Sequence, residues 1–193
     1  MEETIKIFSS LFKTKFPKET QKDILPFLKK KEFKKRSVLT KQGEVPTLFY
    51  ILLSGVVRSL IIDDKGKEHI RNLFVPVTAN GSLACLINKS PSDSQYDCLT
   101  ECVVLECSFN EIRELTFKHH SLSSFYNSSL ELSFIKAEER IYDLSVLNST
   151  ERYLKLKKQI PNIENLITQY HIASYLNITP VQLSRIRKEL YSK

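Results

Sequence analysis

The sequence lacks several features that would mark a membrane or secreted protein. It has no tryptophan, one methionine and only four glycines among 193 residues, and its longest apolar run is Leu48–Leu53. A helix needs about 20 apolar residues to span a bilayer. The first residues are charged rather than apolar, so no secretory signal is predicted and we expect a cytoplasmic protein without a membrane partner.

The four cysteines, Cys85, Cys98, Cys102 and Cys107, include no C-x-x-C pair. Zinc and iron–sulfur sites built on cysteine normally need such a spacing, and a disulfide scaffold needs an oxidising compartment. We therefore predict small, buried, apolar cysteines and no metal.

The position of the glycines indicates the fold class. All four lie between Gly43 and Gly81, so turns and strands are expected in the middle of the chain and helices at its end. From Phe33 to Cys107 the residues are β-branched, aromatic and alternating, and Asp63–Lys67 has the composition of a hairpin loop. The prediction is an α+β chain with an antiparallel β-roll.

No catalytic constellation is present, so an enzyme is not predicted. A cupin enzyme on the same roll would need clustered histidines, but His69 is the only histidine between Phe33 and Cys107. The chain also has neither a G-x-S-x-G elbow nor a G-x-x-x-x-G-K phosphate loop.

Positive charge is concentrated at the end of the chain. Residues 146–193 carry eight Lys and Arg against three Asp and Glu, whereas residues 1–145 carry 21 against 19. Excess positive charge favours an acidic partner. A second basic run, Lys29–Arg36, is interpreted as a solvated helix end and linker rather than a nucleic-acid contact.

A long helix is predicted over Ser121–Leu147, where 27 residues contain no Gly or Pro. Its two apolar stripes cannot both be covered by the roll, so one is expected to pack on a second copy. The alternative is a helix buried only within its own chain. The predicted dimer-interface residues are Leu122, Phe125, Ser129, Leu132, Ile135 and Tyr142.

The last 26 residues predict a helix-turn-helix. A short helix over Thr168–Leu176 is followed by the turn Asn177–Thr179, and Thr179, Pro180 and Gln182 have the capping pattern of a second helix. Leu183, Ile186 and Leu190 would face inward. Arg185 is placed to bind guanine, Ser184 to reach a base or phosphate, and Arg187 and Lys188 to neutralise phosphates. The full set of predicted contacts to double-stranded DNA is Thr179, Val181, Gln182, Ser184, Arg185, Arg187 and Lys188.

This order of parts resembles the Crp/Fnr family of bacterial transcription regulators. The resemblance rests on Gly43–Glu44 and Leu48–Gly55 in the roll, and on Ile172–Pro180 and Leu183–Lys188 at the end, which are similar to members from the Bacteroidetes. It implies a cyclic-nucleotide-binding-like roll over residues 1–120, a dimerisation helix over 121–147 and a DNA-binding domain over 148–193. It also implies RNA polymerase as a further partner.

The chain departs from that family at the expected effector pocket. Cyclic-nucleotide binders of the family have a glycine followed by glutamate and later an arginine, but here Ser82 follows Gly81 and Ser90–Ser94 contains Asp93 and no arginine. We therefore predict no tight binding of cyclic AMP and no known cofactor, with the effector unidentified. The candidate pocket residues are Leu73, Gly81, Ser82, Leu83, Ser92, Asp93 and Ser94.

Further departures concern the DNA-binding part. Most of the β-wing that follows the recognition helix in relatives is expected to be missing, and Val181 stands where an acidic base-contacting residue is common. The predicted function is a homodimeric, sequence-specific DNA-binding regulator. The alternative is a ligand-binding or protein-interaction module of the same fold without DNA binding.

Overall fold

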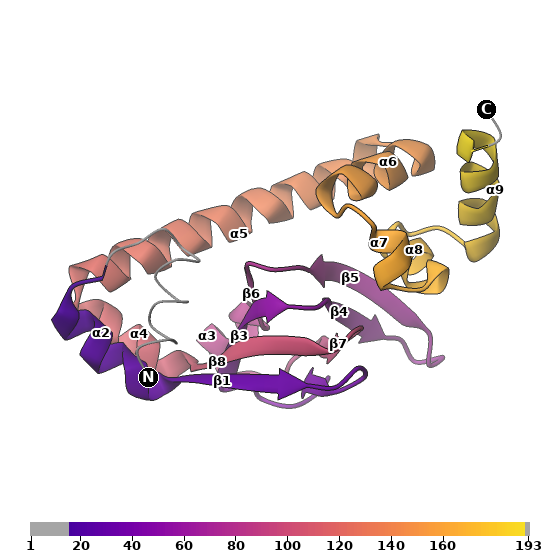
Figure 1. Cartoon of the computed structure of the whole chain (residues 1–193). Coiled ribbons are helices and arrows are strands. Elements are labelled where there is room, and N and C mark those ends of the chain that lie inside the picture. Colours follow the sequence, from indigo (N-terminus) through magenta and orange to yellow (C-terminus); the bar gives the residue numbers. More distant parts are fainter. Residues whose placement is uncertain (1–15, 192–193) are drawn as a thin grey trace.

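The computed structural model describes residues 16–191 and contains a β-roll, one long helix and a group of short helices at the C-terminal end (Figure 1). The strands are β1 (Leu28–Phe33), β2 (Val38–Thr40), β3 (Leu48–Ser54), β4 (Val57–Ile62), β5 (Glu68–Phe74), β6 (Thr78–Asn80), β7 (Gln95–Cys98) and β8 (Cys102–Ser108). The helices of the roll are α2 (Lys18–Ile24), the 3-10 turn η1 (Leu25–Phe27), α3 (Leu83–Asn88) and α4 (Phe109–Lys118).

The strands form two four-stranded antiparallel sheets, in the orders β1-β8-β3-β6 and β2-β7-β4-β5. The hairpin between β4 and β5 forms as predicted. Asp63 Oδ1 accepts hydrogen bonds from the amides of Lys65 and Lys67, and Gly66 takes a φ of 76°. A residue without a Cβ adopts this left-handed conformation at low cost.

Apolar side chains from both sheets fill the inside of the roll. They include Tyr50, Leu52, Val57 and Val104, together with Cys98 and Cys102. All four cysteines are buried free thiols, as predicted. On the outside of the first sheet, Ile51 and Leu105 pack against α2 and α4, so helices cover that face.

The basic run Lys29–Arg36 was assigned incorrectly. Its first part is strand β1, which pairs with β8 from Leu28↔Cys107 to Phe33↔Cys102, and is not a helix end. Leu28 is buried while the lysines between the strand ends are exposed. β1 is an edge strand, and exposed lysines on an edge discourage pairing with another chain.

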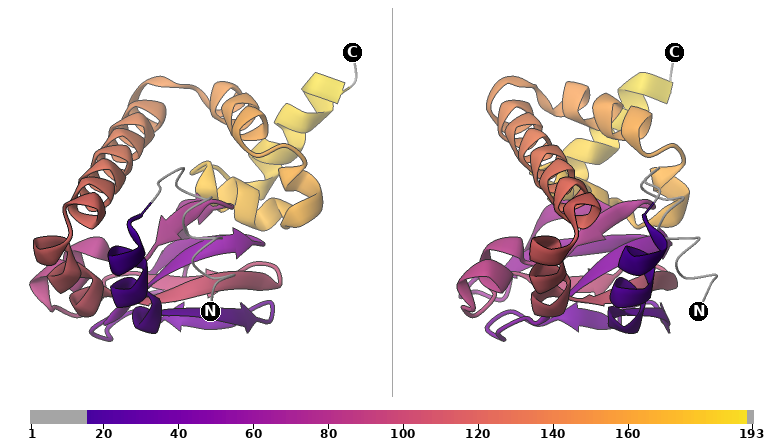
Figure 2. Two further views of the ribbon diagram at one scale, coloured as in Figure 1. Left: turned by 60° about the vertical axis from the view of Figure 1, so that its left-hand side comes forward. Right: turned by 90° about the vertical axis from the view of Figure 1, so that its left-hand side faces the viewer.

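The long helix is α5 (His120–Val146), close to its predicted bounds. It leaves the roll at one end, and α6 (Ser149–Gln159) and α7 (Ile163–Leu166) bring the chain back to the opposite end (Figures 1 and 2). There α8 (Gln169–Tyr175) lies on β5, and α9 (Pro180–Tyr191) ends the described chain. The α+β roll with a long helix and C-terminal helices confirms the predicted fold class, while the domain boundaries stay predictions.

Candidate nucleic-acid interface and effector site

The turn between α8 and α9 is fixed by local hydrogen bonds, as the sequence predicts. Thr168 accepts from the amide of His171 and caps α8, and Asn177 takes a left-handed φ of 55°. Thr179 Oγ1 accepts from the Gln182 amide at 3.2 Å, and Gln182 Oε1 accepts from the Thr179 amide at 2.8 Å. This reciprocal capping box starts α9 at Pro180.

The inner faces of α8 and α9 share one apolar cluster with α6. Ile172, Ala173, Leu176, Leu183 and Ile186 are buried there. Leu190 was predicted to lie inward but is 36% exposed, because it stands in the last turn of α9 beyond that cluster. The two helices are therefore held together by these five buried side chains.

The outer face of α9 is exposed over most of the predicted contact residues. Val181, Ser184, Arg185 and Lys188 all face solvent. Thr179 and Gln182 are exposed too, although Thr179 Oγ1 and Gln182 Oε1 are engaged in the capping box. The resulting surface lies on α9 and at its cap, and Arg185 and Lys188 give it two positive charges.

Arg187 lies differently from its predicted neighbours. It is half-buried, and its Nε is 2.7 Å from Glu164 Oε1 of α7. Glu164 also accepts hydrogen bonds from Tyr153 at 2.6 Å and Tyr191 at 3.1 Å. Burial alone would raise the pKa of Glu164, but these hydrogen bonds and the neighbouring cations keep it below its usual range. Arg187 therefore joins an internal ion pair.

The helix-turn-helix is docked on the roll through α8. Ser174 Oγ accepts from the backbone amide of Ile70 at 3.1 Å and donates to the backbone carbonyl of Glu68 at 3.3 Å, both on β5. His171 Nδ1 lies 3.4 Å from Arg58 Nη1 on β4. Apolar residues continue this contact, since Val56 and Leu99 of the roll join the cluster of Ile172 and Leu183.

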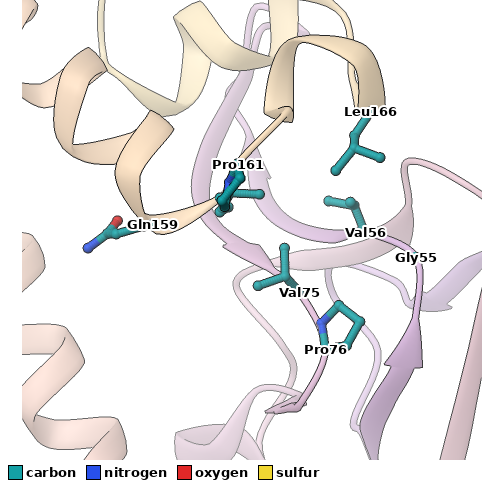
Figure 3. A pocket seen from close by; sticks show the side chains of 8 residues that line it. Gly55, Val56, Val75, Pro76, Gln159, Pro161 and Leu166 are labelled. Atoms are coloured by element: carbon teal, nitrogen blue, oxygen red, sulfur yellow. The ribbon is translucent and has the colours of Figure 1, made fainter.

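A cavity lies in the seam between the roll and the terminal helices (Figure 3). It has a volume of about 360 Å³. Val56 and Val75 project from the roll toward Pro161 and Leu166 on the other side, and Gln159 lies at its margin. The walls are mostly apolar and come from both parts of the chain.

The predicted effector residues do not all meet in one place. Ser82, Ser92 and Ser94 are buried around α3 and the segment before β7, and Asp93 is exposed beside them. Leu83 opens α3 and is half-buried, and a Cβ on Gly81 would lie 3.2 Å from Phe49 Cβ. Leu73, also predicted for the pocket, packs against the apolar cluster that holds the terminal helices.

The structure adds Arg71, which the sequence analysis did not select. From β5 its Nη1 donates to Ser94 Oγ at 3.0 Å and lies 3.6 Å from Asp93 Oδ1. Ser90–Ser94 has no arginine of its own, but the Arg71 guanidinium from β5 thus lies beside it. In the sequence, Arg71 appears only as a basic residue in a strand of mixed polarity. Such a pattern does not show which segment lies beside the strand.

Two buried polar residues accompany this segment. Tyr96 is hydrogen-bonded to Ser82, and burial raises the pKa of the Tyr96 phenol to about 12. Asn80 is 3% exposed, and neither polar atom of its amide has a hydrogen-bond partner among the described residues. Asn80 is paired with Tyr50, whose side chain belongs to the cluster inside the roll. Asn80 was also missed by the sequence analysis.

The predicted dimer residues divide along the length of α5. Leu122 is completely buried and Phe125 packs beside it against the chain's own roll, which removes Leu122 from any surface open to a second copy. Ser129 is half-buried and bonds to the carbonyl of Phe125. Leu132, Ile135 and Tyr142 are 59%, 52% and 56% exposed, so the second half of the stripe is free of the roll.

Neither a metal site nor a membrane span is found in residues 16–191. No group of three or more His, Cys, Asp or Glu side chains there is placed to hold a metal, and no helix is both long and apolar enough to cross a bilayer.

The Cys98 and Cys102 side chains are hydrogen-bonded to each other, which lowers the pKa of Cys102 to about 7 and raises that of Cys98.

Comparison with known proteins identifies a family for the β-roll. The family described as cyclic nucleotide-binding domain matches residues 30–119. The chain is 27% identical over 170 residues to the anaerobic regulatory protein of Aggregatibacter actinomycetemcomitans, covering 82% of this chain and 65% of that protein. The chain is similar to the Crp/Fnr transcription regulators in sequence and in fold.

Other relatives agree with this assignment. The cAMP-activated global transcriptional regulator CRP of Salmonella typhimurium is 26% identical over 132 residues, covering 66% of this chain and 63% of CRP. FixK2 from Bradyrhizobium japonicum shares the fold with a TM-score of 0.73 at 16% identity, covering 86% of this chain and 85% of FixK2. The chain thus spans 63–65% of the length of the two curated relatives named above.

The comparisons bear on two of the earlier predictions. The curated relatives are described as regulators, which agrees with the prediction that the chain is not an enzyme. These comparisons give no support to a Bacteroidetes origin, so the taxon stays a prediction.

Proposed function

We propose that this protein is a homodimeric, sequence-specific DNA-binding transcription regulator of the Crp/Fnr family. The observation that carries the proposal is the exposed outer face of α9, where Val181, Ser184, Arg185 and Lys188 face solvent while the capped turn fixes the helix. A helix of this kind places its first residues against base edges in the major groove. Two copies would contact half-sites about one turn of DNA apart, roughly 34 Å.

The dimer is supported by the exposed part of α5. Leu132, Ile135 and Tyr142 form an apolar stripe that the chain's own roll does not cover. Large exposed apolar patches mark interaction sites, and a two-fold contact between identical helices would bury this one. Light scattering at micromolar concentration should therefore give twice 22.4 kDa.

The residues of α9 are proposed to make two kinds of contact, to bases and to phosphates. Arg185 would bind guanine, Val181 would contact a thymine methyl group, and Ser184 would reach a base or phosphate. Lys188, with Thr179 and Gln182 at the helix start, would contact phosphates. Arg187 would contribute phosphate binding only after leaving Glu164, so we expect the smaller effect from it.

The effector is proposed to act on the roll near Ser92–Ser94. Arg71 supplies a guanidinium there, but Asp93 already faces it, so we expect no tight binding of cyclic AMP. Reduced thiols and a DNA target favour a cytoplasmic role, with RNA polymerase as a further partner.

Selection from genomic fragments with the purified protein, at a stated salt concentration, tests the proposal. On the selected site, Arg185→Ala should cost about 1–3 kcal/mol and relax the preference at one position, whereas Lys188→Ala should weaken all sequences evenly. Unchanged affinity and footprint for Arg185→Ala would remove its base-contacting role. Absence of any salt-dependent DNA retention would favour a module without DNA binding.

A further inference from the structure

The free edge of the second sheet is bonded to a helix rather than to another strand. β5 is the last strand in the order β2-β7-β4-β5. Its outward amide at Ile70 and carbonyl at Glu68 both bond to one side-chain atom, Ser174 Oγ of α8. Edge-strand polar groups need partners, and here the helix-turn-helix supplies them.

A buried charge cluster lies beside this contact. Arg58 Nε and Nη2 face Asp97 Oδ1 and Oδ2 at 2.7 and 3.0 Å, and its Nη1 and Nη2 face Glu68 Oε2 and Oε1 at 2.5 and 3.2 Å. The Arg58 guanidinium is therefore fixed by two carboxylates. His171 of α8 lies on this fixed group, 3.4 Å from Arg58 Nη1.

The long helix holds α8 from another side. The Arg140 guanidinium of α5 lies 4.1 Å from the centre of the Tyr175 ring and donates to the Tyr175 carbonyl. Two adjacent residues of α8 make these contacts: Ser174 bonds to β5, and Tyr175 contacts α5. α8 is thus bonded both to the roll and to the helix proposed to form the dimer.

The docking leaves the proposed DNA-contacting face free. None of Val181, Ser184, Arg185 and Lys188 takes part in these contacts, and all four are exposed while α8 is docked. The docked arrangement is therefore compatible with DNA contact. A DNA with two half-sites at a fixed spacing is bound more tightly when the recognition helices already lie at that spacing. Ordering the helices only on binding would cost free energy.

We propose that Ser174 and Arg58 are positioning residues, which fix the helix-turn-helix on the roll so that the two copies of α9 are presented at one spacing. The proposal rests on the proposed DNA-binding function. The bond between α8 and the edge of β5 would set the distance between the two recognition helices, and α9 would recognise the bases. Loss of the Ser174 hydroxyl should loosen the spacing without changing the contact to a single half-site.

Ser174→Ala and Ser174→Thr are the test pair, with Ser124→Ala on the exposed face of α5 as the control. The probes are a selected DNA with both half-sites, the same DNA lengthened by one base pair between them, and a DNA with one half-site. Ser174→Ala should lose about tenfold in affinity for the first DNA and keep its affinity for the single half-site. Ser174→Thr should recover most of the loss, and the control should match the wild type.

Two results would overturn the positioning role. One is an equal loss on all three DNAs, which is the effect of a damaged fold. The other is an unchanged preference of Ser174→Ala for the original spacing over the lengthened one.

Hydrogen exchange at the Ile70 amide tests the docking without DNA. This amide should exchange at least about tenfold faster in Ser174→Ala than in the wild type, since its partner is removed. Unchanged exchange would show that the contact is not formed in solution. A wild type that binds none of the DNAs would refute the proposed function, whereas the exchange result would still decide the docking.

Discussion

Arg58 and Asp97 face each other through two parallel hydrogen bonds inside the second sheet, 2.7 Å at Nε and 3.0 Å at Nη2. They lie on the paired strands β4 and β7, in direct register. Burial alone would lower the pKa of Arg58, but the bonds to Asp97 and Glu68 raise it, so the side chain is a fixed cation within the sheet. We therefore expect both the stability of the chain and the docking of α8 to depend on this pair.

Replacing Asp97 by alanine should lower the free energy of unfolding by at least about 2 kcal/mol. Breaking a buried pair by removing one partner typically costs about 3–5 kcal/mol, and Glu68, which still faces Arg58, reduces the loss. Denaturant unfolding measures it. The matched control is Glu44→Ala, whose pair with Lys41 at 3.4 Å is exposed and should be worth less than about 1 kcal/mol. Equal losses for the two variants would contradict the importance of the Arg58 cluster.

Lowering the pH should weaken the docking through His171. Burial and the positive charge of Arg58 lower the pKa of His171 from its ordinary 6.5, and Lys35 acts in the same direction while Glu68 and Asp97 oppose it. Below pH 6.5 the unfolded chain therefore binds a proton at His171 more readily than the folded chain does. The free energy of unfolding consequently decreases as the pH is lowered. This single group contributes at most about 1.4 kcal/mol per pH unit.

The comparison of His171→Gln with the wild type isolates this term. Unfolding free energies measured on both sides of pH 6.5 should show a shallower decline for His171→Gln. His120→Gln, at an exposed position of α5, serves as the control for loss of a histidine. Parallel curves for His171→Gln and the wild type would exclude a contribution from His171.

Asn80→Leu should leave stability unchanged or raise it. The Asn80 amide is buried, and no described residue satisfies its polar atoms, so replacing it with an apolar group of similar size removes a desolvation penalty of about 1–3 kcal/mol. Asn80→Asp should instead destabilise, because it places a carboxyl in the same site. Denaturant unfolding of the two variants gives the answer. A marked loss for Asn80→Leu would mean that the amide is satisfied in solution.

Local contacts explain what the sequence determined by itself. The cap at Thr179 and Gln182 spans three residues, and the Asp63 loop closes within four, so their hydrogen bonds depend on neighbours in the chain. Alternating apolar residues fixed the strands of the roll, and the stripe pattern predicted α5 almost to its ends. The exposed face of α9 followed from the same helical periodicity.

Tertiary structure decided the contacts that join distant segments. Arg58 meets Asp97 across 39 residues and His171 across 113, and Ile70 meets Ser174 across 104. Arg71 reaches Ser94, and Leu122 is buried in its own roll, for the same reason. Periodicity shows which face of an element is apolar or charged, but the partner of that face depends on how sheets and helices pack. The helix-turn-helix was therefore evident from the sequence, whereas its attachment to β5 emerged only from the fold.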